Sequence, residues 1–368
     1  MTDTVLRVAK DSDLMRATFV ATGLAHLVST LVPQHDVHIR DVGTAFRLTT
    51  AATQREIEIG VQAQGLPQLL PAIRKPLTRM EQTRRDQGVP IEQLEQRYVP
   101  PGFPHDQIVD YAAERERWRA ALRRSLDSSE DRPQPDPRFP FWAHLCSHFG
   151  LGSSMLRTYP LLVHLWFAHQ GEAAVALCRL ILDYFSGVGC DPSAAGPDTW
   201  LKQIRPQLHS PELKQFNWTA TASQVSALAI ISPTSIKGVN TASARQQPHN
   251  KTLKLFWLEA YLAFAGFLTL ALPAYWQPTR RARKDVATYY PVPCDILFAD
   301  LQALMDQVRG NPKLQAVYEM GSRLPRAYMD VWITLLLSEA LYTIRTQSSN
   351  NAGARPGITE LAACYYKD

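Results

Sequence analysis

The feature that most constrains the fold of this 368-residue chain is an apolar run, LFWLEAYLAFAGFLTLALPAYW, at residues 255–276. A run of this length can span a bilayer as a helix, or it can be buried in the core of a soluble protein. Glu259 interrupts the run, and a carboxylate within a membrane costs on the order of 2–3 kcal/mol. Basic residues flank both ends without the asymmetry that orients a membrane helix. We therefore expect a helix buried in a soluble core.

The N-terminal region predicts a helix followed by strands. Residues 12–32, SDLMRATFVATGLAHLVSTLV, carry apolar side chains three and four apart and end before Pro33, which indicates an amphipathic helix. The stretch 36–61, DVHIRDVGTAFRLTTAATQREIEIGV, then alternates apolar and polar residues, as half-buried strands do. An α+β part over residues 1–65, with one helix and a small antiparallel sheet, is the expected start of the chain.

The remaining sequence predicts four further parts. Residues 66–140 are charged and broken by prolines, which is typical of an insertion and linker. Residues 141–250 form a central helical region with a polar loop at 232–251, and residues 251–348 form a C-terminal helical bundle that includes a basic hinge at 277–293. A loose tail covers residues 349–368. The expected fold class is α+β and mainly α-helical.

The amino-acid composition indicates the cellular compartment of the protein and the charge of the partners that it can bind. The chain is 45% hydrophobic and 20% charged, enough for a substantial core. Its formal net charge of +5 and pI near 8.9 permit a polyanionic partner without requiring one. The five cysteines are widely spaced and form no CxxC pair, so a disulfide framework or zinc knuckle is not indicated. We expect a reduced, cytoplasmic protein.

The motifs of common enzyme classes are absent from the sequence. It contains no GxxxxGK[ST] phosphate loop, no GxGxxG after a strand, no GxSxG elbow and no HExxH. Glu56 and Glu58 share one face of the strand predicted at REIEIG, which we interpret as its solvated outer face. Three other acids, Asp183, Asp295 and Asp300, are interpreted as helix-start and surface residues.

One histidine pair is the best metal candidate. His144 and His148 of HLCSH lie four residues apart on one helical face, and His164 and His169 lie in another apolar helix. No carboxylate accompanies them at ligand spacing, and histidines on apolar helices are commonly core residues. We therefore expect no metal, no cofactor and no catalytic residue. The alternative is a metal-dependent nuclease or hydrolase that uses the His144/His148 region.

A basic and polar pattern suits nucleic acid instead. The stretch 232–251, SPTSIKGVNTASARQQPHNK, contains no acidic residue. Lys and Arg neutralise phosphates, while Arg, Asn and Gln read base edges. A second cluster, 280–284, precedes Tyr289 and Tyr290, which can stack on unpaired bases. Each cluster alone also fits a solvated face. The candidate binding residues are Lys237, Asn240, Arg245, Gln246, Asn250, Lys251, Arg280, Arg281, Arg283 and Lys284.

Segments in both halves resemble the large subunits of type I CRISPR surveillance complexes, the Cascade effectors. The similarity lies in LMRATFVATGLAHLVSTLV followed by VHIRDVGTAFRLTT, in ISPTSIKGVNTASARQQPHNK before the apolar run, and in RRARKDVATYYPVPCDI. It implies a non-enzymatic role in antiviral defence, within a ribonucleoprotein. Guide pairing then reads the target sequence, and the protein reads the flanking motif and the nucleic-acid shape.

The resemblance also implies partners and residue roles. Residues of the 232–251 loop would read the flanking motif, or PAM, in double-stranded DNA or grip its backbone. The 280–284 segment would support the displaced strand, and the N-terminal part would contact the end of the guide RNA. The implied partners are the CRISPR guide RNA, the target DNA, the backbone subunits of the complex, and a recruited nuclease or transposition adaptor. The chain length suits a compact effector, such as that of a CRISPR-associated transposon.

Overall fold

The computed structural model describes residues 3–10, 14–74, 77, 79–96, 98–113, 155–186, 257–276, 285–311, 314, 326–347 and 357–367. These residues belong to two compact units. The first unit contains the described residues up to Leu69 and from His169 onward, and the second contains those between Leu70 and Ala168. The chain thus leaves the first unit after Leu69 and returns to it at His169.

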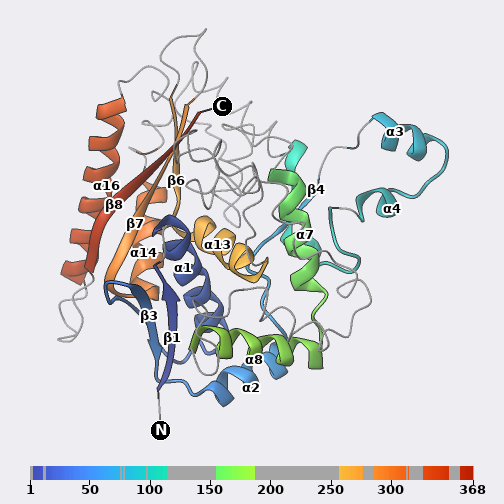
Figure 1. The fold of residues 1–368 in the computed structure, drawn as a ribbon. Coiled ribbons are helices and arrows are strands. Elements are labelled where there is room, and N and C mark those ends of the chain that lie inside the picture. The colour runs from blue at the N-terminus through green and yellow to red at the C-terminus, as the bar shows by residue number, and fades with distance from the viewer. Residues whose placement is uncertain are drawn as a thin grey trace, which may run out of the picture. The chain divides into compact units, whose positions relative to one another are not determined.

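The sheet of the first unit begins with a split β–α–β arrangement. β1 (Thr4–Ala9) pairs antiparallel with β3 (Ala45–Thr50), and β3 pairs antiparallel with β2 (Val37–Asp41). α1 (Leu14–Leu31) connects β1 to β2. Residues of β1 are alternately buried and exposed, as expected for a strand with one face on the core. The predicted N-terminal helix and small antiparallel sheet are therefore confirmed (Figure 1).

Strands from the C-terminal half complete this sheet. β7 (Asp285–Leu297) pairs antiparallel with β2 through residues 295–297 and with β6 (Leu272–Trp276) through residues 285–289. β8 (Gly357–Lys367) pairs antiparallel with β7 between residues 285 and 295. Because β6 and β8 share partners in β7, they occupy its opposite edges. β7 therefore joins the N-terminal strands to the C-terminal ones (Figure 1).

Two expectations for the C-terminal half are wrong. Residues 357–367 of the predicted loose tail form β8, and the predicted basic hinge is strand β7 from Asp285 onward. Both strands are held in place by one long antiparallel ladder between them, in which Asp285 pairs with Lys367. Partners so distant in sequence leave no local signal, so sequence periodicity could not reveal the ladder.

Residues 257–270 of the apolar run form a buried helix, as predicted, but its last residues, 272–276, form strand β6 instead of continuing that helix. α13 (Trp257–Leu270) packs against α1, and nearly all of its residues are buried. The ring of Phe19 in α1 meets the edge of Phe267 in α13 at a centroid distance of 5.5 Å. Glu259 accepts a hydrogen bond of 2.6 Å from the hydroxyl of Tyr184, so this carboxylate is paired inside the protein.

The described helices give weak grounds for a membrane span. By length and composition α1 alone among them could cross a membrane, but 72% of that window is buried inside the protein. α13 has 14 residues, fewer than the roughly 20 that a spanning helix needs. Core helices of soluble proteins have the same properties, and the structure is consistent with a soluble protein.

α2 (Gln54–Gln64) corrects the strand predicted at REIEIG. The Thr53 hydroxyl accepts a hydrogen bond from the backbone N–H of Glu56 at 3.2 Å. The Glu56 carboxylate in turn accepts one from the backbone N–H of Thr53 at 2.7 Å. This capping box starts a helix whose buried residues, Ile57 and Val61, are four apart. That apolar face packs against α8 (Glu172–Ser186). The segment is therefore a helix, although its apolar and polar residues alternate as in a strand.

Two predicted C-terminal helices are present. α14 (Phe298–Gly310) directly follows β7, and α16 (Arg326–Gln347) packs against α14. The hydroxyl of Tyr289 in β7 donates a hydrogen bond to the carboxylate of Asp330 in α16, which also connects α16 to the sheet. With helices and one antiparallel sheet in the first unit, the predicted α+β fold class is confirmed.

The second unit contains two paired strands and several helices. β4 (Ala72–Arg74) and β5 (Ile108–Asp110) are parallel, and α7 (Met155–Phe167) packs against β4. The hydroxyl of Tyr159 donates to the Pro71 carbonyl at 2.7 Å. Among its described residues, the other elements are α3 (Arg79–Asp86), α4 (Ile91–Glu95) and a short 3-10 helix, η1 (His105–Gln107).

Candidate functional site

All the residues predicted to bind nucleic acid lie outside the described residues, and so do His144 and His148. Chain connectivity nevertheless shows which described elements follow or flank these segments. The 232–251 loop precedes α13 by a few residues, and residues 277–284 join β6 to β7. These ten predicted residues are Lys237, Asn240, Arg245, Gln246, Asn250, Lys251, Arg280, Arg281, Arg283 and Lys284.

The ends of three strands meet where the 280–284 segment joins the sheet. Trp276, the last residue of β6, pairs with Asp285, the first residue of β7. Asp285 also pairs with Lys367 at the end of β8. The segment therefore begins and ends on adjacent strands at one end of the sheet, and a third strand terminates beside them.

The histidines within the described residues do not form a metal site. His169 is buried, and its ring stacks on Trp257 at a centroid distance of 6.0 Å and an interplanar angle of 9°. His164 lies on α7, where burial lowers its pKa, an effect opposed by a backbone hydrogen bond with Gln96. No group of three or more His, Cys, Asp or Glu suited to a metal occurs in the described part of the chain.

Most candidate acids have structural partners. Glu56 belongs to the capping box, and its backbone and side-chain bonds with Thr53 lower its pKa. Asp295 lies 2.5 Å from His38 Nε2 and 3.3 Å from an Arg40 nitrogen. Burial raises the pKa of Asp300 in the first turn of α14, and Asp36 adds to that shift. These contacts explain the acids as parts of the fold.

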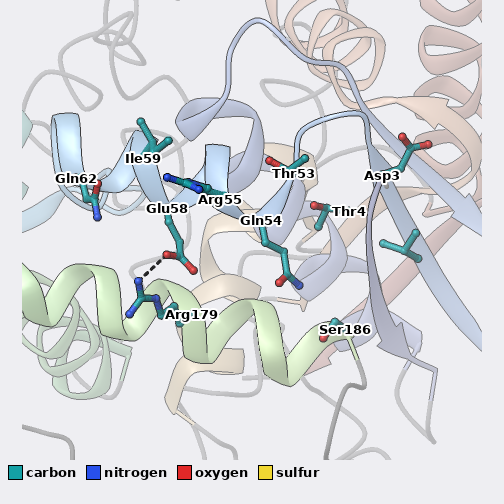
Figure 2. Close-up of a pocket in the computed structure, with 11 residues that line it drawn as sticks. Asp3, Thr4, Thr53, Gln54, Arg55, Glu58, Ile59, Gln62, Arg179 and Ser186 are labelled. Carbon is teal, nitrogen blue, oxygen red and sulfur yellow. Dashed lines mark hydrogen bonds and ion pairs between the residues drawn. The ribbon is translucent and has the colours of Figure 1, made fainter. Parts of the chain in front are cut away.

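A polar hollow in the first unit is the candidate site that the structure adds. It has a volume of about 1150 Å³ and lies between the start of β1, the first turns of α2 and one face of α8 (Figure 2). Its lining contains acidic side chains, basic side chains and several neutral hydrogen-bonding groups. The lining residues are Asp3, Thr4, Val5, Thr53, Gln54, Arg55, Glu58, Ile59, Gln62, Arg179 and Ser186.

One ion pair crosses this hollow. Arg179 of α8 donates to Glu58 of α2 at 2.8 Å (Figure 2). The hydrogen bond and charge of Glu58 raise the pKa of Arg179, so its guanidinium stays charged at neutral pH. Because more than half of the Arg179 side chain is exposed, solvent screens the pair and its contribution to stability is small.

The hollow has the size and the hydrogen-bonding groups to hold a polar ligand. The amino end of α2 is already occupied by the Glu56 carboxylate, so it is not open to an added anion. The lining contains hydroxyls at Thr4, Thr53 and Ser186 but no histidine that could act as a base. Nearby, burial raises the pKa of the Cys178 thiol to about 12, which keeps it protonated at neutral pH.

The sequence contains a signal for one part of this hollow but none for the other. The Thr53-x-x-Glu56 spacing is a capping-box pattern that could have identified α2. The pairing of Glu58 with Arg179 depends on packing between distant helices and has no local signal.

Comparison with known proteins adds no assignment, because no protein-family model, no curated protein and no solved structure matches this chain.

Proposed function

We propose that this chain is a non-catalytic, nucleic-acid-binding subunit of an RNA-guided CRISPR effector complex, of the type I large-subunit class. The observation that carries the proposal is the stretch Ser232–Lys251, which contains no acidic residue among its many donors. Its Lys and Arg side chains suit phosphates, and its Arg, Asn and Gln side chains suit base edges. The cluster 280–284 adds four cations within five residues.

The architecture around both segments supports the proposal. Binding residues are commonly found on loops that a rigid scaffold positions. The 232–251 loop leads into α13, which is buried, and the 280–284 segment leads into β7, the central strand.

In this proposal the loop contacts the target-flanking motif in double-stranded DNA, and the 280–284 segment supports the displaced strand. The protein also supports the end of the guide RNA. Base pairing with the guide reads the target itself, so the subunit needs no catalytic residue, metal or cofactor. It works in the cytoplasm with the backbone subunits and with a recruited nuclease or transposition adaptor.

The test is flank-dependent DNA binding by the assembled complex. Changing Lys237, Asn240 and Arg245 to Ala removes one phosphate-type and two base-reading side chains from the loop. Each base contact contributes about 1–3 kcal/mol, so affinity for the correct flank should fall at least tenfold. The matched control changes Thr241 and Ser243 to Ala in the same loop and should bind normally.

Two results would contradict the loop assignment. The triple variant could retain full flank-dependent affinity within an assembled complex of normal composition. Alternatively, it could lose affinity equally for correct and altered flanks, which would assign the loop to phosphate contacts only.

A further inference from the structure

The helix α16 is apolar on both sides, although only one side faces the core. Its inner face buries Met329, Ile333 and Leu336, among others. Its outer face carries five large apolar side chains that are 40% to 70% exposed. These are Tyr328, Val331, Trp332, Leu335 and Tyr342. α16 thus carries half of the large apolar side chains that are exposed in the described part of the chain.

The outer residues form a stripe that is interrupted by Ser338 and Glu339 between Leu335 and Tyr342. Tyr328, Leu335 and Tyr342 follow one another at intervals of seven residues, with Val331 and Trp332 between the first two. A seven-residue repeat of apolar side chains lets one helix pack along another. The spacing suits a partner helix that lies along α16. Aromatic residues of this kind are also those that contribute most to protein interfaces.

The order of residues in the stripe is nearly symmetric about Leu335. Tyr328 lies seven residues before it and Tyr342 seven residues after it, while Trp332 and Ser338 lie three before and three after. In an antiparallel pair related by a two-fold axis at Leu335, Tyr328 faces the other copy's Tyr342. Trp332 then faces Ser338, which places an indole N–H donor beside a hydroxyl group that can accept. Antiparallel helices also have opposed dipoles, which favours the pairing.

We propose that two copies of this chain associate through their α16 outer faces, antiparallel and with the two-fold axis at Leu335. The exposed side chains offer roughly 500 Å² per copy, or about 1,000 Å² in the pair, at the lower limit of specific interfaces. The dimer should therefore form at micromolar concentrations. The proposal is independent of the nucleic-acid function, because no predicted binding residue lies on α16.

The first test measures the mass of the purified full chain by sedimentation equilibrium over a range of concentrations. The wild type should show a monomer–dimer equilibrium. Leu335→Arg places two like charges at the axis and should raise the dissociation constant at least tenfold. Met80→Arg changes a more exposed apolar residue on α3 and should leave the equilibrium unchanged. The proposal is overturned if the wild type stays monomeric at a protein concentration of about 100 micromolar, or if Leu335→Arg dimerises with normal affinity.

The second test fixes the helix orientation by disulfide cross-linking. The background changes every native cysteine except the buried Cys178 to Ser. Leu335→Cys should cross-link to itself, because residues at the axis meet. Tyr328→Cys should cross-link only when mixed with Tyr342→Cys, since the two positions are about 21 Å apart along one helix. Self-cross-linking of Tyr328→Cys alone would indicate a parallel pair and contradict the proposal.

Discussion

Gly23 of α1 and Gly266 of α13 lie against each other where the two central helices cross. A β-carbon added at Gly23 would lie 3.1 Å from the backbone nitrogen of Gly266 and 2.0 Å from the carbonyl oxygen of Leu262. A β-carbon at Gly266 would lie 1.9 Å from the carbonyl oxygen of Phe19. The obstacles are backbone atoms, so only glycine permits this separation of the helices.

We expect Gly23→Ala to destabilise the protein. The methyl group forces α1 and α13 apart, and the overpacking should exceed the gain of up to about 1 kcal/mol from the better helix propensity of Ala. The net loss in the free energy of unfolding should be about 2 kcal/mol or more, measured by urea denaturation. The control is Gly310→Ala at the end of α14, where a β-carbon meets nothing within 4 Å. Equal stability of the two variants would refute the close approach.

Stability should decrease in mild acid because of His26. Burial lowers the pKa of this α1 residue from 6.5 to about 4, and its ring lies 5.6 Å from that of Phe298. Between these pH values the unfolded chain binds a proton that the folded protein does not. The contribution of His26 to the free energy of unfolding is therefore complete above pH 6.5. It decreases by up to about 3 kcal/mol as the pH falls to about 4.

The variant His26→Gln isolates this effect, because it cannot titrate in this range. Denaturation of wild type and variant at several pH values should give a free-energy difference that depends on pH. The wild type should lose more stability than the variant between pH 6.5 and 4. Parallel stability curves for the two proteins would show that His26 is protonated equally in the folded and unfolded states.

The capping box of α2 gives a smaller, local prediction. Thr53→Ala removes the hydroxyl that accepts from Glu56 N–H, and N-cap substitutions of this type cost about 1 kcal/mol. Thr53→Ser should retain most of that stability, because the hydroxyl remains. Thermal denaturation of the two variants checks the prediction. If both variants were equally destabilised, the contribution of Thr53 would come from its methyl group.

The salt dependence of DNA binding tests the 280–284 segment. Each phosphate contact contributes about 0.7–0.9 to the slope of log K against log salt concentration. Changing Arg280, Arg281, Arg283 and Lys284 to Gln should therefore reduce the slope by roughly 3. Changing Arg84 and Arg85 of α3, where Arg85 already lies 3.9 Å from Asp86, should leave it unaltered. An unaltered slope in the quadruple variant would exclude phosphate contacts by this segment.

Local patterns predicted the helices better than the long-range sheet. The helix between Leu14 and Leu31 and the buried run after Trp257 have strong apolar signals within single segments. β8 is held by its ladder with β7, so its order depends on residues far away in the chain. At REIEIG the alternation suggested a strand, but the Thr53–Glu56 capping box and the packing of Ile57 and Val61 produced a helix.

The candidate sites were predicted less completely for related reasons. Side-chain inventory in the sequence identifies segments suited to nucleic acid, but not the surface on which their residues meet. The hollow near Arg179 forms because α2 packs against α8, and the outer stripe of α16 is evident only once Met329 and Ile333 are known to be buried. Both features depend on tertiary packing, which residue spacing alone does not provide.

The most direct test of the central proposal is the RNA that the protein carries in its native host. The tagged chain would be purified under mild conditions, and the bound RNA would be sequenced. We predict short, repeat-derived guide RNAs, recovered together with several backbone subunits of one complex. Purified protein that carries neither guide RNA nor such subunits, under conditions that express the guide RNAs, would contradict the proposed function.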